Sequence, residues 1–257
     1  FHSVLHMATE QPPIYNPPTD LDISVWRYMD LAKFVSLLST RSLYFCRTDL
    51  LGDPYEGTMP HTVSSTVTDM MAEDQSEIDS RARLSAIREA YRQWAYVSCW
   101  HMNEDESAAM WSLYARTNEA VAIRSTYRKL RDGLPENVYT GTVEYIDYRT
   151  QQFPEYDLDF PLVHKRLSFQ HEREVRAVIP EPPFDGDDDP AAKRAAILRE
   201  NDEVGKAVPV SLDALVDRVY VAPTTPAWFS KSVASLVAQY GFAFDVYPST
   251  LDEPPNF

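Results

Sequence analysis

The stretch Phe169-Gln-His-Glu-Arg-Glu-Val-Arg-Ala-Val-Ile179 carries most of the information about the fold. Its second half, from Val175 to Ile179, is rich in β-branched residues and predicts a buried β-strand. Its first half carries Glu172 and Glu174, and side chains two residues apart on a strand point to the same face. Because two like charges at the start of a buried strand are costly, we expect either neighbouring cations that neutralise them or a catalytic use.

Strands and short helices alternate along the rest of the chain. The sequence predicts further strands over residues 23–29, 42–47, 94–100, 119–124, 138–148, 207–211, 217–222 and 243–247. Helices are expected over 31–38 with Asp30 as N-cap, over 64–94, after 103–107, from Ser125 or Thr126 to Leu130, and over 190–201 and 225–240. No repeat and no linker divides the chain. We therefore predict a single α+β domain over residues 23–250, with a mixed, largely antiparallel sheet and flanking helices.

Composition narrows the class of protein. Residues 1–22 are interpreted as a tag remnant followed by an extended, proline-rich lead-in. The net charge of -15 disfavours a nucleic-acid partner without excluding one, because nucleic-acid binding draws on basic side chains. With only 2 cysteines, no C-x-x-C pair and no apolar run that could span a bilayer, we expect a cytoplasmic protein without membrane contact and without a structural metal site. The absence of glycine-rich phosphate-binding motifs excludes the Rossmann and P-loop classes.

Several motifs together resemble a bacterial family known as domain of unknown function 2971. They are Trp26-Arg-Tyr-Met29, Leu43-Tyr-Phe45, Asp53-Pro-Tyr-Glu-Gly57, Ser98-Cys-Trp-His101, Glu106-Ser-Ala-Ala-Met-Trp111 with Tyr114, Val121-Ala-Ile-Arg124, Lys165-Arg166, Glu172-Arg-Glu-Val-Arg176, Val219-Tyr-Val-Ala-Pro223 and Trp228-Phe229. The resemblance extends from about Trp26 to Tyr247. The family name implies no activity.

The order of the predicted elements also looks like the ADP-ribosyltransferase fold. Members of that superfamily with an arginine–serine–glutamate triad cleave NAD. The resemblance implies that Arg27 holds the NAD phosphate or ribose and that Ser98 supports the nicotinamide ribose. It implies that Glu174 stabilises the oxocarbenium ion, with Glu172 as its helper. The sequence departs from the pattern after Ser98, because Cys99 and Trp100 stand where the toxins of the superfamily show a Ser-Thr-Ser type of run.

Each candidate also has a structural interpretation. Glu172 and Glu174 can form an ion-pair ladder with Lys165, Arg166 or Arg124 on neighbouring strands. Arg27 binds either a ligand phosphate or a carboxylate such as Glu174 or Glu56. Tyr28 and Tyr44 stack either on a nucleotide ring or within the core. His101, at the end of a strand, is either a general base or a bystander.

These observations favour an NAD-dependent ADP-ribosyltransferase-like enzyme or NAD glycohydrolase, with NAD as a substrate and an acceptor macromolecule that the sequence does not identify. A bacterial toxin or phage-defence role is the expected setting. Two alternatives stay open. One is a divalent-metal phosphodiesterase or nuclease that uses the carboxylates of Asp53, Glu56, Glu172 and Glu174, although the sequence shows no clear metal-ligand spacing. The other is a non-enzymatic nucleotide-binding sensor or adaptor in which Arg27 and Arg124 hold the ligand. The enzymatic interpretation requires Arg27 and Glu174 to meet across one cleft.

Overall fold

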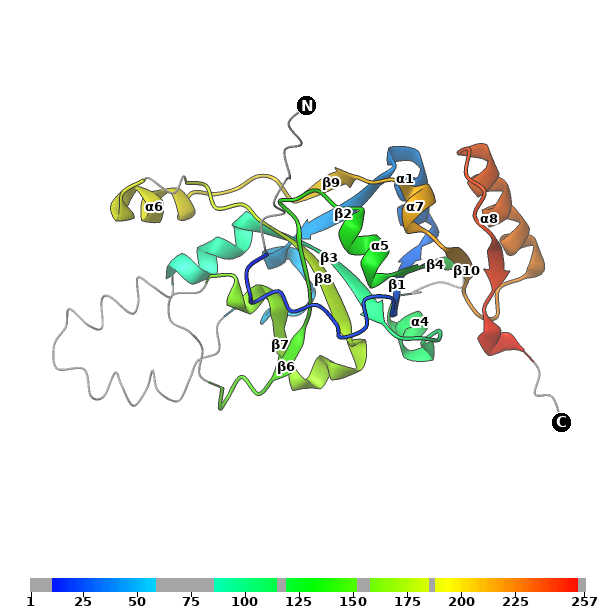
Figure 1. The fold of residues 1–257 in the computed structure, drawn as a ribbon, viewed down its shortest axis with the longest axis horizontal. Helices are drawn as coiled ribbons and strands as arrows, with labels where there is room; N and C mark the ends of the chain where they lie inside the picture. Colours follow the sequence, from blue (N-terminus) through cyan, green and yellow to red (C-terminus); the bar gives the residue numbers. More distant parts are fainter. Residues whose placement is uncertain (1–10, 59–85, 115–118, 152–157, 185–187, 254–257) are drawn as a thin grey trace, which may run out of the picture.

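The fold was described from a computed structural model that covers residues 11–58, 86–114, 119–151, 158–184 and 188–253 (Figure 1). These residues form a mixed, largely antiparallel sheet of 9 strands with flanking helices. The predicted α+β class is therefore confirmed. Within the described ranges, no helix is both long enough and apolar enough to cross a bilayer.

The main sheet has the strand order β11-β10-β4-β1-β3-β2-β9, and β8 and β5 continue it from β3 on another path. Its strands are β1 (Ser24–Asp30), β2 (Ser42–Arg47), β3 (Ala95–Met102), β4 (Ala120–Thr126), β5 (Tyr139–Thr142), β8 (Glu174–Pro180), β9 (Gly205–Pro209), β10 (Arg218–Val221) and β11 (Val246–Pro248). Neighbouring strands are antiparallel except β10 and β11. A separate parallel pair consists of β6 (Glu144–Ile146) and β7 (His164–Arg166).

Strand β3 lies at a fork in the sheet. One of its edges pairs with β8 from Ala95 to His101. Its other edge pairs first with β2, at Tyr96 and Val97, and then with β1, at His101 and Met102. Between these two short pairings, the strands β1 and β2 diverge from each other.

The helices begin where local capping predicts. The helix α1 (Leu31–Thr40) starts after Asp30, whose carboxylate accepts a hydrogen bond from the Lys33 amide at 2.8 Å. The helix α5 (Tyr127–Asp132) starts after Thr126, which accepts from the Lys129 amide at 3.3 Å. The other helices are α4 (Ala108–Tyr114), α6 (Pro190–Ile197), α7 (Leu212–Leu215) and α8 (Ala227–Gln239), and residues 86–91 are also helical. Short 3-10 helices are η1 (Thr48–Leu50), η2 (Arg92–Trp94), η3 (Phe160–Val163), η4 (Leu167–Glu172) and η5 (Thr250–Asp252).

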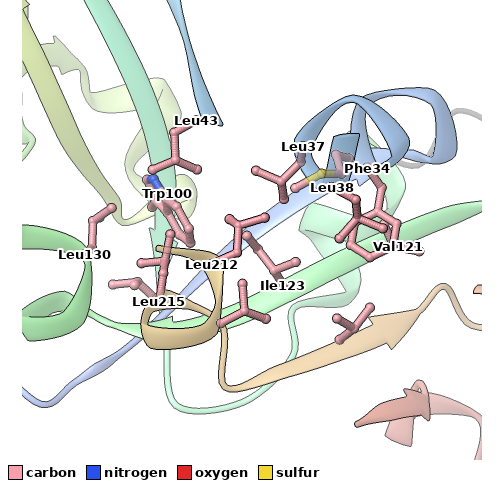
Figure 2. Packing of buried hydrophobic residues seen from close by; sticks show 14 of the residues in the cluster. Phe34, Leu37, Leu38, Leu43, Trp100, Val121, Ile123, Leu130, Leu212 and Leu215 are labelled. Carbon is pink, nitrogen blue, oxygen red and sulfur yellow. The ribbon is translucent and has the colours of Figure 1, made fainter. Parts of the chain in front are cut away.

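Apolar side chains on the first face of the sheet form the main core. Figure 2 shows Phe34 and Leu37 of α1 and Leu212 of α7 gathered with Ile123 of β4 and Trp100 of β3. In Figure 1, α1, α5 and α7 lie on one side of the strands and α4 on the other. This arrangement buries one face of the sheet under α1, α5 and α7.

The second face carries two smaller apolar clusters. One cluster is built around Val97, Leu162 and Val178, and the other around Trp26 and Trp111. Polar side chains of β3 and β8 lie on this second face between the two apolar clusters, and they form the site described below.

The structure differs from two of the predicted strands and adds one that was not predicted. The strand expected over 138–148 is divided, because β5 pairs with β8 whereas β6 pairs with β7 in the other sheet. The strand β7 was not predicted, and the last strand begins at Val246 rather than at residue 243. Most of the helix predicted over 64–94 falls on residues 59–85, which lie outside the described residues.

Candidate functional site

Five charged side chains are buried together on the second face of the sheet, and we call them the charged cluster. They are Glu56, Lys165, Glu172, Glu174 and Arg176. Arg176 is 0% exposed, which is unusual for a guanidinium. Charged groups are tolerated at such depth only when they are paired and hydrogen-bonded.

Different elements bring these five residues together. Glu174 and Arg176 alternate along β8 and therefore point to the same face. Lys165 comes from β7, and Glu56 from the loop that follows η1. Glu172 is not on the strand, contrary to our expectation: it ends the 3-10 helix η4, and Arg173 follows with a left-handed backbone (φ 40°). This reversal still directs the Glu172 carboxylate to the same place as that of Glu174.

Lys165 lies at the centre of the cluster. Its Nζ is 2.8 Å from Glu56 Oε1, 2.5 Å from Glu172 Oε2 and 3.3 Å from Glu174 Oε2. Its ammonium therefore occupies the space among three carboxylates that a metal ion would need. Among the described residues, no group of three His, Cys, Asp or Glu side chains is placed to hold a metal ion.

Arg176 joins the other side of the cluster. Its Nε donates to Glu174 Oε1 at 2.6 Å, its Nη2 to Glu56 Oε2 at 2.5 Å, and its Nη1 to the Leu162 carbonyl at 2.8 Å. With three carboxylates against two cations, the cluster has one negative charge in excess. The ion-pair interpretation is thus confirmed for Lys165, whereas Arg166 pairs with Asp53 at 2.7 Å instead.

The two carboxylates of the Glu-x-Glu pair have opposite pKa shifts. Burial alone would raise the pKa of Glu174, but the adjoining Arg176 and Lys165 outweigh burial and lower the pKa to about 2. Burial also raises the pKa of Glu172, and there the single cation Lys165 does not reverse the effect. Glu174 is therefore a fixed anion, and Glu172 is the carboxylate that can take up a proton more easily.

Aromatic rings border the cluster on the solvent side. Burial and the negative charge of Glu172 both raise the pKa of Tyr114, whose side chain is 44% exposed. The half-buried ring of Phe169 lies 4.7 Å from Lys165 Nζ, measured to the ring centroid. The Arg166 guanidinium lies over the exposed ring of Tyr55, with its Cζ 4.2 Å from the ring centroid. We call Tyr55, Tyr114 and Phe169 the aromatic rim.

Arg27 and Glu174 do not meet across one cleft. Ser98 and Trp100 alternate with Cys99 and His101 along β3, and Trp100 belongs to the main core. Arg27 donates to Ser98 Oγ and lies over the Trp100 ring, so it lies on the first face. Glu174 is paired with His101 on the second face. The expected arrangement of Arg27, Ser98 and Glu174 around one dinucleotide is therefore wrong.

Arg27 instead joins the strands that diverge at the fork. It donates to Ser98 Oγ of β3 and, at 2.8 Å, to the Tyr44 carbonyl of β2. Within the described residues no carboxylate is in contact with it, so neither the predicted bridge to Glu174 nor that to Glu56 is present. Burial lowers its pKa.

The other residues predicted to bind a nucleotide do not form one site with Arg27, which contacts only the backbone carbonyl of Tyr44 among them. Arg124 is paired with Trp26 across β1 and β4, and its guanidinium donates to Ser24 Oγ at 2.7 Å. Tyr28 packs edge-to-face on Trp111, on the second face of the sheet. The Tyr44 ring is exposed at β2. Arg27 and Arg124 thus lie on opposite faces and cannot hold one ligand between them.

Glu106, which we had noted only as part of a motif, has a positioning role. Its carboxylate accepts hydrogen bonds from Trp111 Nε1 at 2.9 Å, from Ser249 Oγ at 2.7 Å and from the Thr250 amide at 2.7 Å. It therefore attaches the C-terminal turn to α4.

Arg176 is the residue of the site that our sequence interpretation missed. The available signal was its position two residues after Glu174, which places both side chains on one face of a strand. The contribution of Glu56 could not be located in the same way, because it comes from a loop 120 positions away from Arg176. Comparisons with family models, with curated proteins and with solved structures found no match to this chain.

Proposed function

We propose that the chain is an NAD-dependent enzyme of the ADP-ribosyltransferase type, which breaks the bond between nicotinamide and ribose and passes ADP-ribose to an acceptor or to water. The observation that carries this proposal is the pair Glu172 and Glu174, two neighbouring buried carboxylates whose pKa values are shifted in opposite directions. Such a difference assigns distinct roles to two carboxylates in glycosyl-transfer chemistry.

The charge of the cluster supports the proposed chemistry. Cleavage of an N-glycosidic bond develops positive charge on the ribose, as in glycosidases. The one excess negative charge of the cluster is held in place by Lys165 and Arg176, so it needs no reorganisation when that positive charge appears. In this proposal, Glu172 faces the ribose and Glu174 keeps Lys165 and Arg176 in position.

The aromatic rim supports a ligand of the nucleotide type. Exposed aromatic rings that border a charged site offer stacking surfaces for a nicotinamide or adenine ring. Phe169 lies next to Lys165, which also pairs with Glu172, so a ring stacked on Phe169 would stand beside that carboxylate. The guanidinium of Arg173, exposed beside Glu172, donates a hydrogen bond to Asn103 Oδ1 at 2.8 Å, and its remaining donors offer a site for a phosphate.

The requirement set by the superfamily pattern is not met, because Arg27 and Glu174 lie on opposite faces of the sheet. The present proposal therefore keeps the reaction but assigns it to a different set of residues, those of the charged cluster. Arg27 and Ser98 belong to the fork on the first face and take no part in the reaction. The resemblance to domain of unknown function 2971 also stays a proposal. Its support is that residues from four of the motifs, Glu56, His101, Lys165 and Arg176, lie on the same face of the sheet around Glu174.

The decisive experiment measures nicotinamide release from NAD by chromatography and transfer of labelled ADP-ribose to protein or nucleic-acid acceptors. We expect Glu172→Gln, which keeps the shape of the side chain, to lower turnover at least about 100-fold, the scale of a lost catalytic carboxylate. The exposed Glu136→Gln is the matched control and should retain wild-type turnover. Wild-type turnover no higher than that of Glu172→Gln would contradict the proposal. Tight NAD binding without turnover would favour a sensor or adaptor instead.

The proposed setting is the bacterial cytoplasm, with a role in toxicity or phage defence. An enzyme that consumes NAD or modifies an essential acceptor should arrest growth when it is produced in a bacterial host. We expect growth arrest with the wild type and normal growth with Glu172→Gln at equal protein levels. Equal growth of both strains, with and without phage, would contradict this role.

A further inference from the structure

His101 has a buried nitrogen atom that the fold does not use. The side chain is 4% exposed and lies on the second face of β3, in register with Glu174 of β8. Its Nδ1 is 2.6 Å from the Glu172 carbonyl oxygen. Because a carbonyl oxygen only accepts, Nδ1 carries the proton, and in the neutral ring Nε2 then carries a lone pair. Among the described residues, Nε2 has no hydrogen-bond partner.

The surroundings keep this ring neutral. Burial lowers the pKa of His101, the hydrogen bond to Glu172 opposes this shift, and the positive charges of Arg173 and His171 add to it. From β1, the Tyr28 ring faces the imidazole with its centroid 6.2 Å away. Glu174, on the neighbouring strand β8, is tied to Arg176 and Lys165. At neutral pH, Nε2 is therefore a proton acceptor.

An acceptor atom that is buried without a partner is costly, and a protein interior normally satisfies or removes it. The hydrogen bond from Nδ1 fixes the ring through the backbone of Glu172, the residue whose side chain faces the proposed substrate. The backbone of Glu172 thus fixes the orientation of the imidazole ring. Nε2, which has no hydrogen-bond partner among the described residues, can act as a base that accepts a proton from a bound ligand.

We propose that Nε2 of His101 accepts the proton of the nucleophile that attacks the ribose, an inference that rests on the proposed function. The nucleophile is a hydroxyl group of the acceptor or of water. Its oxygen forms a bond to C1′ of the ribose, and the bond from C1′ to nicotinamide breaks with its electron pair leaving on nicotinamide. The proton of the hydroxyl passes to Nε2, and the imidazolium later returns it to solvent. Glu172 stabilises the positive charge on the ribose, so the two residues have separate tasks.

The test compares His101→Gln with His171→Gln, the same change at an exposed histidine nearby. We expect His101→Gln to lower kcat at least 100-fold while KM for NAD changes less than 3-fold. The wild-type rate should rise with pH as His101 loses its proton, with a pKa below the ordinary histidine range. This rise of the rate with pH, the acid limb of the pH profile, should be absent in His101→Gln. His171→Gln should keep the rate and the limb.

A second measurement serves if His101→Gln does not fold. In wild-type protein labelled with ¹⁵N-histidine, we expect the Nε2 resonance of His101 to show an unprotonated nitrogen and to shift when NAD is added. An unchanged resonance at saturating NAD, or a His101→Gln variant with the wild-type rate and pH profile, would overturn the inference and leave the proposed function intact. Absence of NAD turnover in the wild type would overturn both.

Discussion

Arg176 holds the charged cluster together at the scale of single residues. We expect Arg176→Met to lower the free energy of unfolding by about 3–5 kcal/mol, because two buried carboxylates, Glu56 and Glu174, would lose one of the two cations that they share. Urea denaturation followed by fluorescence measures this loss. The control is Arg149→Met, whose side chain is 87% exposed and whose loss should cost less than about 0.5 kcal/mol. Equal stabilities of the two variants would contradict the assignment.

The opposite pKa shifts of Glu172 and Glu174 predict opposite contributions to acid stability. The lowered pKa of Glu174 means that its stabilisation is complete above the ordinary range of a glutamate and is lost as the pH falls toward about 2. The raised pKa of Glu172 has the reverse sign, since protonation of this group favours the folded state. The free energy of unfolding should therefore fall less steeply between pH 5 and pH 3 in Glu174→Gln than in the wild type, and more steeply in Glu172→Gln. Parallel curves for both variants would refute these signs.

The capping residues show what sequence reveals about single positions. Asp30 was predicted as an N-cap, and either Ser125 or Thr126 as another; Asp30 and Thr126 accept the expected backbone hydrogen bonds, because capping depends on residues three positions apart. Glu172 shows the limit. The left-handed backbone of Arg173 ends a 3-10 helix at Glu172, and neither a glutamate nor an arginine is a residue type that predicts such a helix end.

At the scale of elements, the fork at β3 depends on Arg27. Its guanidinium joins Ser98 of β3 to Tyr44 of β2 where no strand pairing does so. We expect Arg27→Met to lower the free energy of unfolding by about 1–3 kcal/mol, the cost of leaving these buried polar groups unpaired. Arg199→Met, an exposed change of the same kind, is the control in urea denaturation.

The same variant separates the two interpretations of Arg27. If Arg27 acts only in the fork, NAD turnover of Arg27→Met should stay within about 3-fold of the wild type under conditions in which the variant is folded. A loss of turnover together with full stability would show that Arg27 binds the substrate, as the superfamily pattern implies.

The division of the strand expected over 138–148 could not be derived from its pattern. Its alternation is that of one strand, yet Thr142 pairs with Val175 in the main sheet, and Glu144 pairs with His164 in the small one. The partners decide where such a segment bends, and they lie 20 and 33 residues away along the chain. The alternation therefore predicts strand character but not strand membership.

At the scale of the whole molecule, Glu106 attaches the C-terminal segment to the body of the protein. We expect Glu106→Ala to speed hydrogen exchange across residues 249–253 at least about 10-fold, because Ser249 and Thr250 would lose the carboxylate that holds them, whereas β11 keeps its pairing with β10. Exchange in β3 should be unchanged. Glu104→Ala, in the same loop and exposed, is the control. Mass spectrometry of exchanged peptides gives both rates, and a uniform increase across the chain would contradict this local role.

The sequence could not predict on which face of the sheet each candidate residue lies, because this depends on the register between strands that are far apart in the chain. Arg27, Ser98 and Glu174 each fall on a predicted strand, and all three strands are present. Whether two such side chains meet depends on register, here the pairing of Trp26 and of Glu174 with the same residue, His101. A shift of one residue exchanges the faces, and no local pattern records it. Strand order and residue types thus suggested a triad, but the register places Arg27 and Ser98 on one face of the sheet and Glu174 on the other.

The short pairings of β3 with β1 and with β2 create a mechanically weak line in the sheet. Strand pairing joins the wing formed by β2 and β9 to the rest of the sheet through only two residues of β3, and Arg27 and the packing of Leu43 and Phe45 in the main core complete the attachment. Bending forces on the sheet therefore concentrate along this line, on the face opposite to the charged cluster. A limited protease or a mechanical pull would detach that wing first, while the carboxylates on the other face keep their partners.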